Sequence, residues 1–209
     1  MPKPDFKVYL ITDRTQTKGR DLLWVLEQAL DAGIKAIQLR EKDLADRDLF
    51  FLAEKASKLC QGYGSALFVN ERIDIALAVN AAGVQLGNSS VPIGLARQLL
   101  GTQKMIGLST HSLEEAFEAQ QQGADFVLFG PVYFTPSKAT YGPPQGLNKL
   151  KEIVEKISLP VYAIGGIKLD NIPDLRSIGV SGVALISAIM SSDSPKKATS
   201  DLLRMIGSA

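Results

Sequence analysis

The sequence contains one cysteine, one histidine and one tryptophan among its 209 residues. A lone cysteine, Cys60, excludes an internal disulfide framework, and with His111 as the only histidine there is no Cys/His cluster for zinc. The formal net charge is only +1, so no excess of basic residues indicates nucleic acid or an anionic membrane as a partner. No segment reaches the roughly 18 consecutive apolar residues of a membrane span, and the N-terminal segment lacks the apolar stretch of a signal peptide. We therefore expect a cytoplasmic protein without membrane or nucleic-acid partners.

Short β-rich apolar runs alternate with amphipathic helical patterns along the whole chain, which is typical of βα units and a parallel sheet. Eight such units in 209 residues leave about 26 residues for each. The pattern predicts one domain over residues 1–209 with the α/β fold of a (β/α)8 TIM barrel. A doubly wound open sheet is the alternative, but the count of eight and the absence of a Gly-x-Gly-x-x-Gly turn after the first run favour the barrel. The apolar runs are 7–12, 34–40, 66–70, 83–87, 104–109, 125–130, 160–166 and 182–187.

Glycines recur where a helical pattern gives way to the next strand. A residue just past a helix often adopts a positive φ angle, which glycine accepts without steric cost. We expect this conformation at four of them and assign them no role in chemistry. They are Gly33, Gly83, Gly123 and Gly179.

Three polar residues close the second run at alternate positions. Gln38, Arg40 and Lys42 would point to the same face of an extended segment. Two cations and an amide at a barrel mouth, where active sites form, predict a site for a polyanion. The alternative is a solvated rim in which Glu41, Asp43 and other carboxylates neutralise the cations.

The seventh and eighth runs end in a glycine pair and a serine. Barrel enzymes often bind a phosphate there, through main-chain N–H groups at the start of a short helix. Gly165 and Gly166 would allow close approach of the main chain, and Ser187 would add a hydroxyl. A plain tight turn is the alternative.

The segment 130–146 is much longer than the usual loop between a strand and its helix, so we expect a lid over the site, with a plain surface loop as the alternative. Thr135, Ser137 and Lys138 would present two hydroxyls and a cation from this lid. His111 begins the fifth helical pattern, where it suits either a general base or a capping role.

Seven segments together resemble the thiamine phosphate synthase and TenI superfamily, whose fold is a small βα barrel. Each is weak alone, but they occur in the superfamily's order over nearly the whole chain. They are VYLITDR, GIKAIQLREKD, FVNERIDIALAVNAAGVQLG, HSLEEA, FGPVYFTPSK, AIGGI and ALISAI.

The resemblance implies that hydroxymethylpyrimidine diphosphate is joined to thiazole phosphate, giving thiamine phosphate and pyrophosphate. It implies catalytic roles for Arg40, Lys42 and Lys138. It implies Mg²⁺ as cofactor, with Glu71 as the protein ligand, and we expect a homodimer as one possible assembly. The substrate-binding positions implied are Gln38, Asn70, Ser109, Thr135, Ser137, Gly166, Ile186 and Ser187.

Three positions depart from the superfamily's patterns. Glu71 and Ser90 stand where the synthases have aspartates, so one of two metal carboxylates is missing. Pro131 stands where the TenI-like tautomerases carry their histidine. The cationic set favours the synthase, whereas a metal-free thiazole phosphate tautomerase and an inactive regulatory binding protein remain alternatives.

Overall fold

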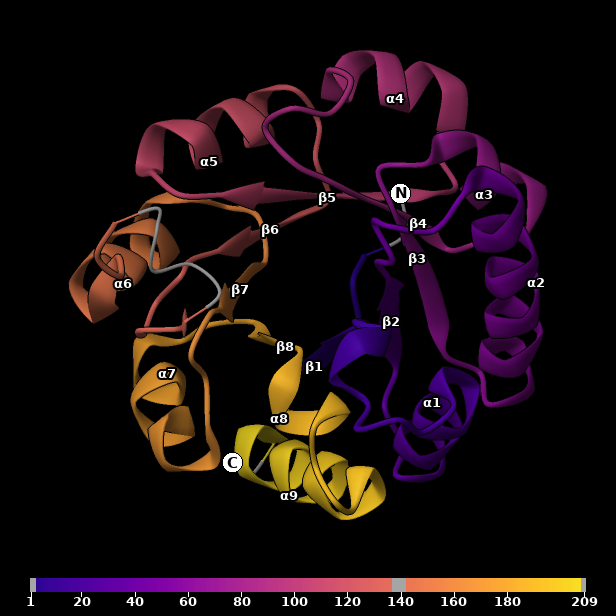
Figure 1. The fold of residues 1–209 in the computed structure, drawn as a ribbon. Coiled ribbons are helices and arrows are strands. Elements are labelled where there is room, and N and C mark those ends of the chain that lie inside the picture. Colours follow the sequence, from indigo (N-terminus) through magenta and orange to yellow (C-terminus); the bar gives the residue numbers. More distant parts are fainter. Residues whose placement is uncertain (1–2, 137–141, 208–209) are drawn as a thin grey trace.

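The computed structural model describes residues 3–136 and 142–207. Parallel strands alternate with helices along the chain, and the helices form a ring around the strands (Figure 1). The strands are β1 Val8–Ile11, β2 Ala36–Leu39, β3 Ala66–Asn70, β4 Gly83–Leu86, β5 Met105–Thr110, β6 Phe126–Phe129, β7 Val161–Ile164 and β8 Gly182–Leu185. The helices are α1 Leu22–Asp31, α2 Asp46–Gly62, α3 Ile73–Ala78, α4 Ile93–Leu100, α5 Leu113–Gln121, α6 Gly146–Lys156, α7 Ile172–Ile178, α8 Ser187–Met190 and α9 Pro195–Gly207, with single 3-10 turns η1 Arg14–Gln16 and η3 Leu169–Asn171.

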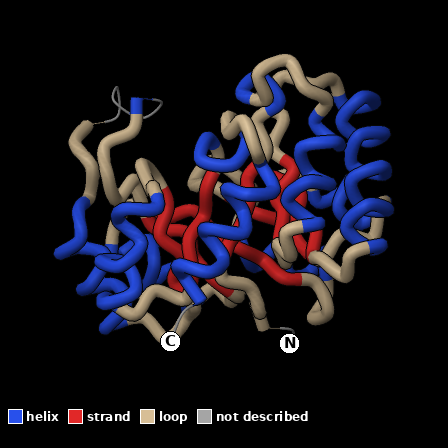
Figure 2. Tube along the Cα trace, turned by 90° about the horizontal axis from the view of Figure 1, so that it is seen from below, coloured by secondary structure: helices blue, strands red, loops and turns tan. Residues whose placement is uncertain are grey.

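The sheet closes on itself, because β1 pairs in parallel with both β2 and β8. The predicted single-domain (β/α)8 TIM barrel is therefore confirmed, and the open-sheet alternative is wrong. In the side view the helices enclose the strands, and the first and last described residues lie at the same end of the barrel (Figure 2). In barrels of this fold, active sites lie at the carboxyl-terminal ends of the strands.

Two separate apolar cores hold the barrel together. The larger one lies between the strands and the helices, and the smaller one fills the barrel interior. Aromatic rings dominate the interior, where Phe6 stacks on Tyr162 and Phe68 meets Phe126 edge to face. These rings fill the barrel near the amino-terminal ends of the strands, so a ligand can enter only from the carboxyl-terminal end.

The predicted positive φ angle is found at three of the four turn glycines, Gly33, Gly123 and Gly179. The prediction is wrong for Gly83, which lies inside β4. A Cβ atom there would approach the carbonyl oxygen of Met105 to 2.0 Å, so this glycine permits close contact between β4 and β5. The left-handed residue after α3 is Asn80, with φ of 51°.

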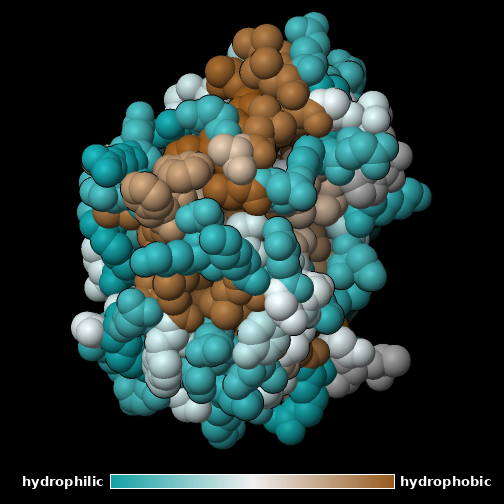
Figure 3. Space-filling view, turned by 90° about the vertical axis from the view of Figure 1, so that its right-hand side faces the viewer, coloured by the Kyte–Doolittle hydropathy of each residue, from teal (hydrophilic) through white to brown (hydrophobic). Residues whose placement is uncertain are grey.

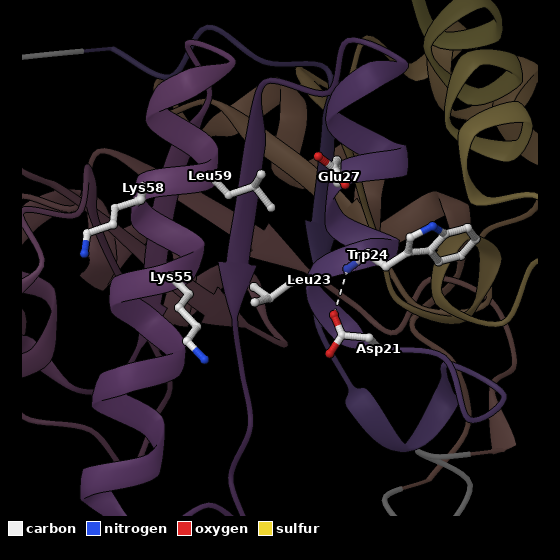
Figure 4. Close-up of a pocket in the computed structure, with 7 residues that line it drawn as sticks. All are labelled: Asp21, Leu23, Trp24, Glu27, Lys55, Lys58 and Leu59. Carbon is white, nitrogen blue, oxygen red and sulfur yellow. Dashed lines mark hydrogen bonds between the residues drawn. The ribbon is translucent and has the colours of Figure 1, made fainter.

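The outer surface carries helix caps and exposed apolar side chains. Asp21 caps α1 by accepting a 3.0 Å hydrogen bond from the N–H of Trp24, at the edge of a shallow groove between α1 and α2 (Figure 4). Brown apolar patches show on another face (Figure 3), and Leu77, Leu95 and Leu99 are among the exposed apolar residues of α3 and α4. In the described residues, no helix combines the length and apolar character needed to span a bilayer.

Candidate active site

The strand register sorts the inward-facing residues into stacked layers, each supplied by alternate strands. Followed around the barrel, it places Gln38, Gln85, Leu128 and Ala184 in one layer above the aromatic rings. The next layer towards the strand ends contains Ile11, Asn70, Ser109 and Ile164. Beyond it the same alternation brings Arg40 to the rim, in the same layer as Ile186. The mouth thus has a polar side on β2 to β5 and a more apolar side on β6 to β8.

Glu41 and Asp43, the two carboxylates that the rim alternative names, do not neutralise the cations that end β2. Glu41 and Asp43 both pair with Arg14, at 3.2 and 2.5 Å from its Nη1 atom. Among the described residues, no carboxylate forms an ion pair with the Arg40 guanidinium, although its charge acts on the nearby Asp13 carboxylate. The Nζ atom of Lys42 forms an ion pair with Glu71 at 3.9 Å. Arg40 therefore brings a positive charge to the mouth that a bound anion would balance.

Gln38 lies within the barrel with only 2% of its surface exposed. In the described part of the chain its Nε2 atom has no hydrogen-bond partner. Its neighbour is the hydroxyl of Tyr9, whose pKa burial raises well above the usual value. The Tyr9 hydroxyl has no other partner there and lies close enough to interact with this amide, so the Gln38 donor does not by itself require a ligand atom.

Glu71 is held in a strained position at the end of β3. Its φ angle of 61° is rare for a residue with a side chain, and such strain is concentrated at functional sites. Its carboxylate accepts hydrogen bonds from Ser90 Oγ at 3.0 Å and from Asn70 Nδ2 at 3.1 Å. The N–H of Gly87 donates to Ser90 Oγ at 2.8 Å, so the serine hydroxyl is fixed against the carboxylate.

This arrangement fits one Mg²⁺ ion completed by water and substrate. Among the described residues no group of three acidic, histidine or cysteine side chains could hold a metal by itself. The Glu71 carboxylate and the Ser90 oxygen lie together and are hard oxygen donors, which Mg²⁺ prefers, and this ion is often held by one carboxylate with substrate phosphates. Asp74, on α3, is occupied elsewhere, because Arg72 binds it at 2.9 and 2.6 Å and lowers its pKa.

The opposite side of the mouth is built on the glycine pair after β7. Gly165 and Gly166 both adopt positive φ angles, of 96° and 66°. The chain after β6 lies directly on this turn, with the N–H of Tyr133 donating to the carbonyl of Gly165 at 3.0 Å. A Cβ atom on Gly166 would lie 2.5 Å from the carbonyl oxygen of Phe134, so only glycine fits here. Ile186 and Ser187 directly follow β8, the strand that pairs with β7, and α8 begins at Ser187.

The segment 130–146 is closed at its base by two main-chain hydrogen bonds. The N–H of Gln145 donates to Pro131 at 2.7 Å, and that of Gly146 donates to Val132 at 3.1 Å. Thr135 is half-buried next to this base. Ser137 and Lys138 lie outside the described residues, and so does the middle of the predicted lid.

His111 lies just before α5, but the residue that caps this helix is Ser112, whose Oγ accepts a 3.2 Å hydrogen bond from the N–H of Glu115. The N–H of His111 donates to the Glu115 carboxylate at 2.6 Å, and its ring Nδ1 donates to the carbonyl of Gly130 at 2.5 Å. The ring therefore ties the end of β5 to the end of β6. Pro131, which follows Gly130, has no titratable group for the proton transfer of a tautomerase.

Residues predicted from separate motifs thus meet at one end of the barrel. Gln38, Arg40, Asn70, Glu71 and Ser109 share its polar side, while Gly166, Ile186 and Ser187 lie on the other. Sequence reasoning missed Gln85, whose amide lies beneath Ser109. The signal was available, since Gln85 is a polar residue at an inward position of an otherwise apolar strand.

Comparison with known proteins identifies relatives of the whole chain. Residues 8–189 match the family described as thiamine monophosphate synthase. The thiamine-phosphate synthase of Clostridium novyi is 44% identical over 198 residues, covering 95% of this chain and 97% of the relative. A thiamine phosphate pyrophosphorylase structure from Pyrococcus furiosus superimposes with a TM-score of 0.88 at 39% identity, covering 97% of this chain and 96% of that one. A 3-hexulose-6-phosphate synthase structure, at 20% identity and a TM-score of 0.67, shares the fold alone. The chain therefore belongs to the thiamine monophosphate synthase family.

Proposed function

We propose that this protein joins hydroxymethylpyrimidine diphosphate to thiazole phosphate and releases pyrophosphate. The observation that carries the proposal is the two-sided mouth, in which Arg40, without an ion pair among the described residues, lies across from a glycine turn suited to a second phosphate. In this reaction the C–O bond between the pyrimidine methylene and the diphosphate breaks. The thiazole nitrogen then bonds to that carbon, becoming a thiazolium, while the diphosphate keeps the electron pair of the broken bond.

The polar side of the mouth binds and stabilises the leaving group. Arg40 offers a planar pair of donors to phosphate oxygens, and Lys42 adds a mobile positive charge. Lys138, from the segment 130–146, is proposed as a third cation. Charge stabilisation of this kind, fixed in place before the bond breaks, is commonly the largest contribution to catalysis.

Glu71, with Ser90 beside it, would hold Mg²⁺ on the same side. When bound, this ion would neutralise part of the charge that develops on the departing diphosphate. Asn70 donates to Glu71 and so helps to fix the position of its carboxylate.

The thiazole phosphate is assigned to the opposite side. Gly166 lets its phosphate approach the main chain, and Ile186 and Ser187 border the same space, where Ser187 adds a hydroxyl. Thr135 and Ser137 would contact the thiazole from the long segment. This separation keeps the two phosphorylated substrates on opposite walls, with their reacting atoms between them.

Three assays separate the proposal from its alternatives. The synthase forms thiamine phosphate and pyrophosphate when both substrates are supplied. Deuterium exchange into thiazole phosphate alone would instead support the tautomerase, and binding without turnover would support a regulatory protein. Absence of product with both substrates and Mg²⁺ would overturn the proposal.

Replacing Arg40 by alanine is expected to lower kcat/KM for the pyrimidine diphosphate about 100-fold or more. The charged hydrogen bonds it supplies are worth about 1.5–3 kcal/mol each. Arg47→Ala is the matched control, because Arg47 lies on the outer surface of α2 over the ring of Phe51. Equal activity of the two variants would remove Arg40 from the site.

We further propose a homodimer formed through the apolar face of α3 and α4. Leu95 and Leu99 are 45% and 55% exposed, and exposed apolar patches commonly mark interfaces. Sedimentation of Leu95→Lys/Leu99→Lys beside the wild type tests this, with monomer expected only for the variant. The cytoplasmic location stays a prediction.

A further inference from the structure

The barrel interior carries two amides in one layer, Gln38 and Gln85, and the proposed function uses only the first of them. Gln85 lies in β4 with 2% of its surface exposed, in the same layer as Gln38. The other two members of the layer, Leu128 and Ala184, are apolar. A second amide at this depth therefore needs its own explanation.

The two ends of the Gln85 amide have different surroundings. Its Nε2 atom donates to Ser109 Oγ in the layer above, at 3.2 Å. Its Oε1 atom is buried and has no hydrogen-bond partner in the described part of the chain. That oxygen lies over Gly107, where a Cβ atom would approach it to 2.4 Å.

Stability alone does not account for this side chain. An unpaired buried acceptor destabilises a fold, whereas an apolar side chain of similar volume at this position would not carry that cost. Residues that break such a rule are expected at functional sites. The hydrogen bond to Ser109 then explains why a glutamine stands at this position.

That bond decides what Ser109 can offer to a ligand. A hydroxyl that accepts from below keeps its own hydrogen for another partner. No acceptor for this hydrogen is found among the described residues, and Ser109 is only half-buried, at the level of Asn70. We propose that Gln85 is a positioning residue that fixes Ser109 as a hydrogen-bond donor towards the pyrimidine substrate.

The inference rests on the proposed function and refines its pyrimidine site. Ser109 and the Nε2 atom of Gln38 would be two donors on one side of the barrel. A pyrimidine ring carries two nitrogen acceptors, so its chemistry matches this pair. The diphosphate would then extend towards Arg40 and Lys42 at the rim.

The test is a double-mutant cycle on Gln85→Met and Ser109→Ala, with Gln61→Met as control. Gln61 also donates its Nε2 to a serine hydroxyl at 3.2 Å, but on the outer helix α2. Calorimetry measures the Kd for hydroxymethylpyrimidine diphosphate and, separately, for thiazole phosphate. Thermal unfolding of each free variant shows whether the change damages the fold.

Gln85→Met is expected to weaken pyrimidine diphosphate binding about five- to tenfold, the effect of one hydrogen bond, with no change for thiazole phosphate. In the Ser109→Ala background it should have no further effect. The Tm of free Gln85→Met should equal or exceed that of the wild type, and Gln61→Met should bind both ligands normally. Additive losses, equal weakening of both ligands, or a lowered Tm with a proportionate loss of binding would overturn the inference.

Failure of the proposed function would look different. A wild type that binds the pyrimidine diphosphate without turning it over contradicts the synthase, while the binding cycle still decides the role of Gln85. A wild type that does not bind it overturns both.

Discussion

Gly166→Ala is expected to abolish measurable binding of thiazole phosphate and to lower turnover at least 100-fold. Its Cβ would lie 2.5 Å from the carbonyl oxygen of Phe134 and 2.8 Å from the Cβ of Tyr133. Because both neighbours belong to the chain that leads to Thr135, the glycine turn and this chain would have to separate. One methyl group would therefore disturb both walls of the proposed phosphate site. Titration of the variant with thiazole phosphate measures the loss.

Gly179→Ala is the matched control for this variant. Gly179 has a similar left-handed conformation, with φ of 86°, but its nearest neighbour to a Cβ atom is Val154 at 3.9 Å. It lies after α7, away from the carboxyl-terminal ends of the strands. Both variants suffer the cost of a side chain at positive φ, of about 1 kcal/mol, so their Tm values should fall alike from that cause. Unchanged thiazole phosphate affinity in Gly166→Ala would rule out the glycine turn as the phosphate site.

Glu71→Gln is expected to remove Mg²⁺-dependent turnover and to leave thiazole phosphate affinity intact. The substitution preserves the shape of the side chain while removing the carboxylate that the ion requires. Turnover across a Mg²⁺ titration, with EDTA as the zero point, measures the effect. Asp74→Asn is the control, since that carboxylate is bound by Arg72 and should not affect activity. Full activity of Glu71→Gln in excess EDTA would eliminate a metal-dependent synthase.

Ser90→Asp should have the opposite effect on the same site. The serine oxygen lies 3.0 Å from the Glu71 carboxylate, so an aspartate there would place two negative charges together. Without metal they repel, which lowers the Tm and raises the pKa of one carboxyl. With Mg²⁺ the second carboxylate adds about 1–4 kcal/mol of attraction before desolvation is subtracted. Thermal unfolding with and without Mg²⁺ should therefore show a larger stabilisation in Ser90→Asp than in the wild type. An equal response in both proteins would contradict a metal site at Glu71.

The fold was predictable because its signals are local and repeated. Apolar runs of strand length, each followed by a helical period, leave few arrangements open, and their number selected the closed barrel. The error at Gly83 shows the limit of such reasoning. The sequence does not distinguish a glycine that precedes a strand from one that belongs to it. Only the structure does so here, because the main chain of Met105 lies too close to Gly83 for a side chain.

The sequence predicted which types of residue line the site better than it predicted how these residues are paired. Strand ends carrying Gln38, Arg40 and the Gly165–Gly166 pair could be recognised, because the fold brings all strand ends to one face. The sequence could not tell which carboxylates neutralise which cations. Arg14 lies 27 residues before Glu41, yet it forms ion pairs with both Glu41 and Asp43. These two carboxylates therefore do not neutralise Arg40.

The sequence by itself therefore determined the barrel, its family and the chemical types gathered at its mouth, since periodicity and motif order are properties of the chain. Only the tertiary structure decided how those groups are paired. Closure of the barrel sets Gln85 beneath Ser109 and Ser90 against Glu71, through the register of neighbouring strands and the loops that follow them. A hydrogen bond acts over about 3 Å, whereas a sequence pattern carries no distances between strands. For this reason the donor direction of Ser109 and the oxygen pair at Glu71 could be derived only from the folded chain.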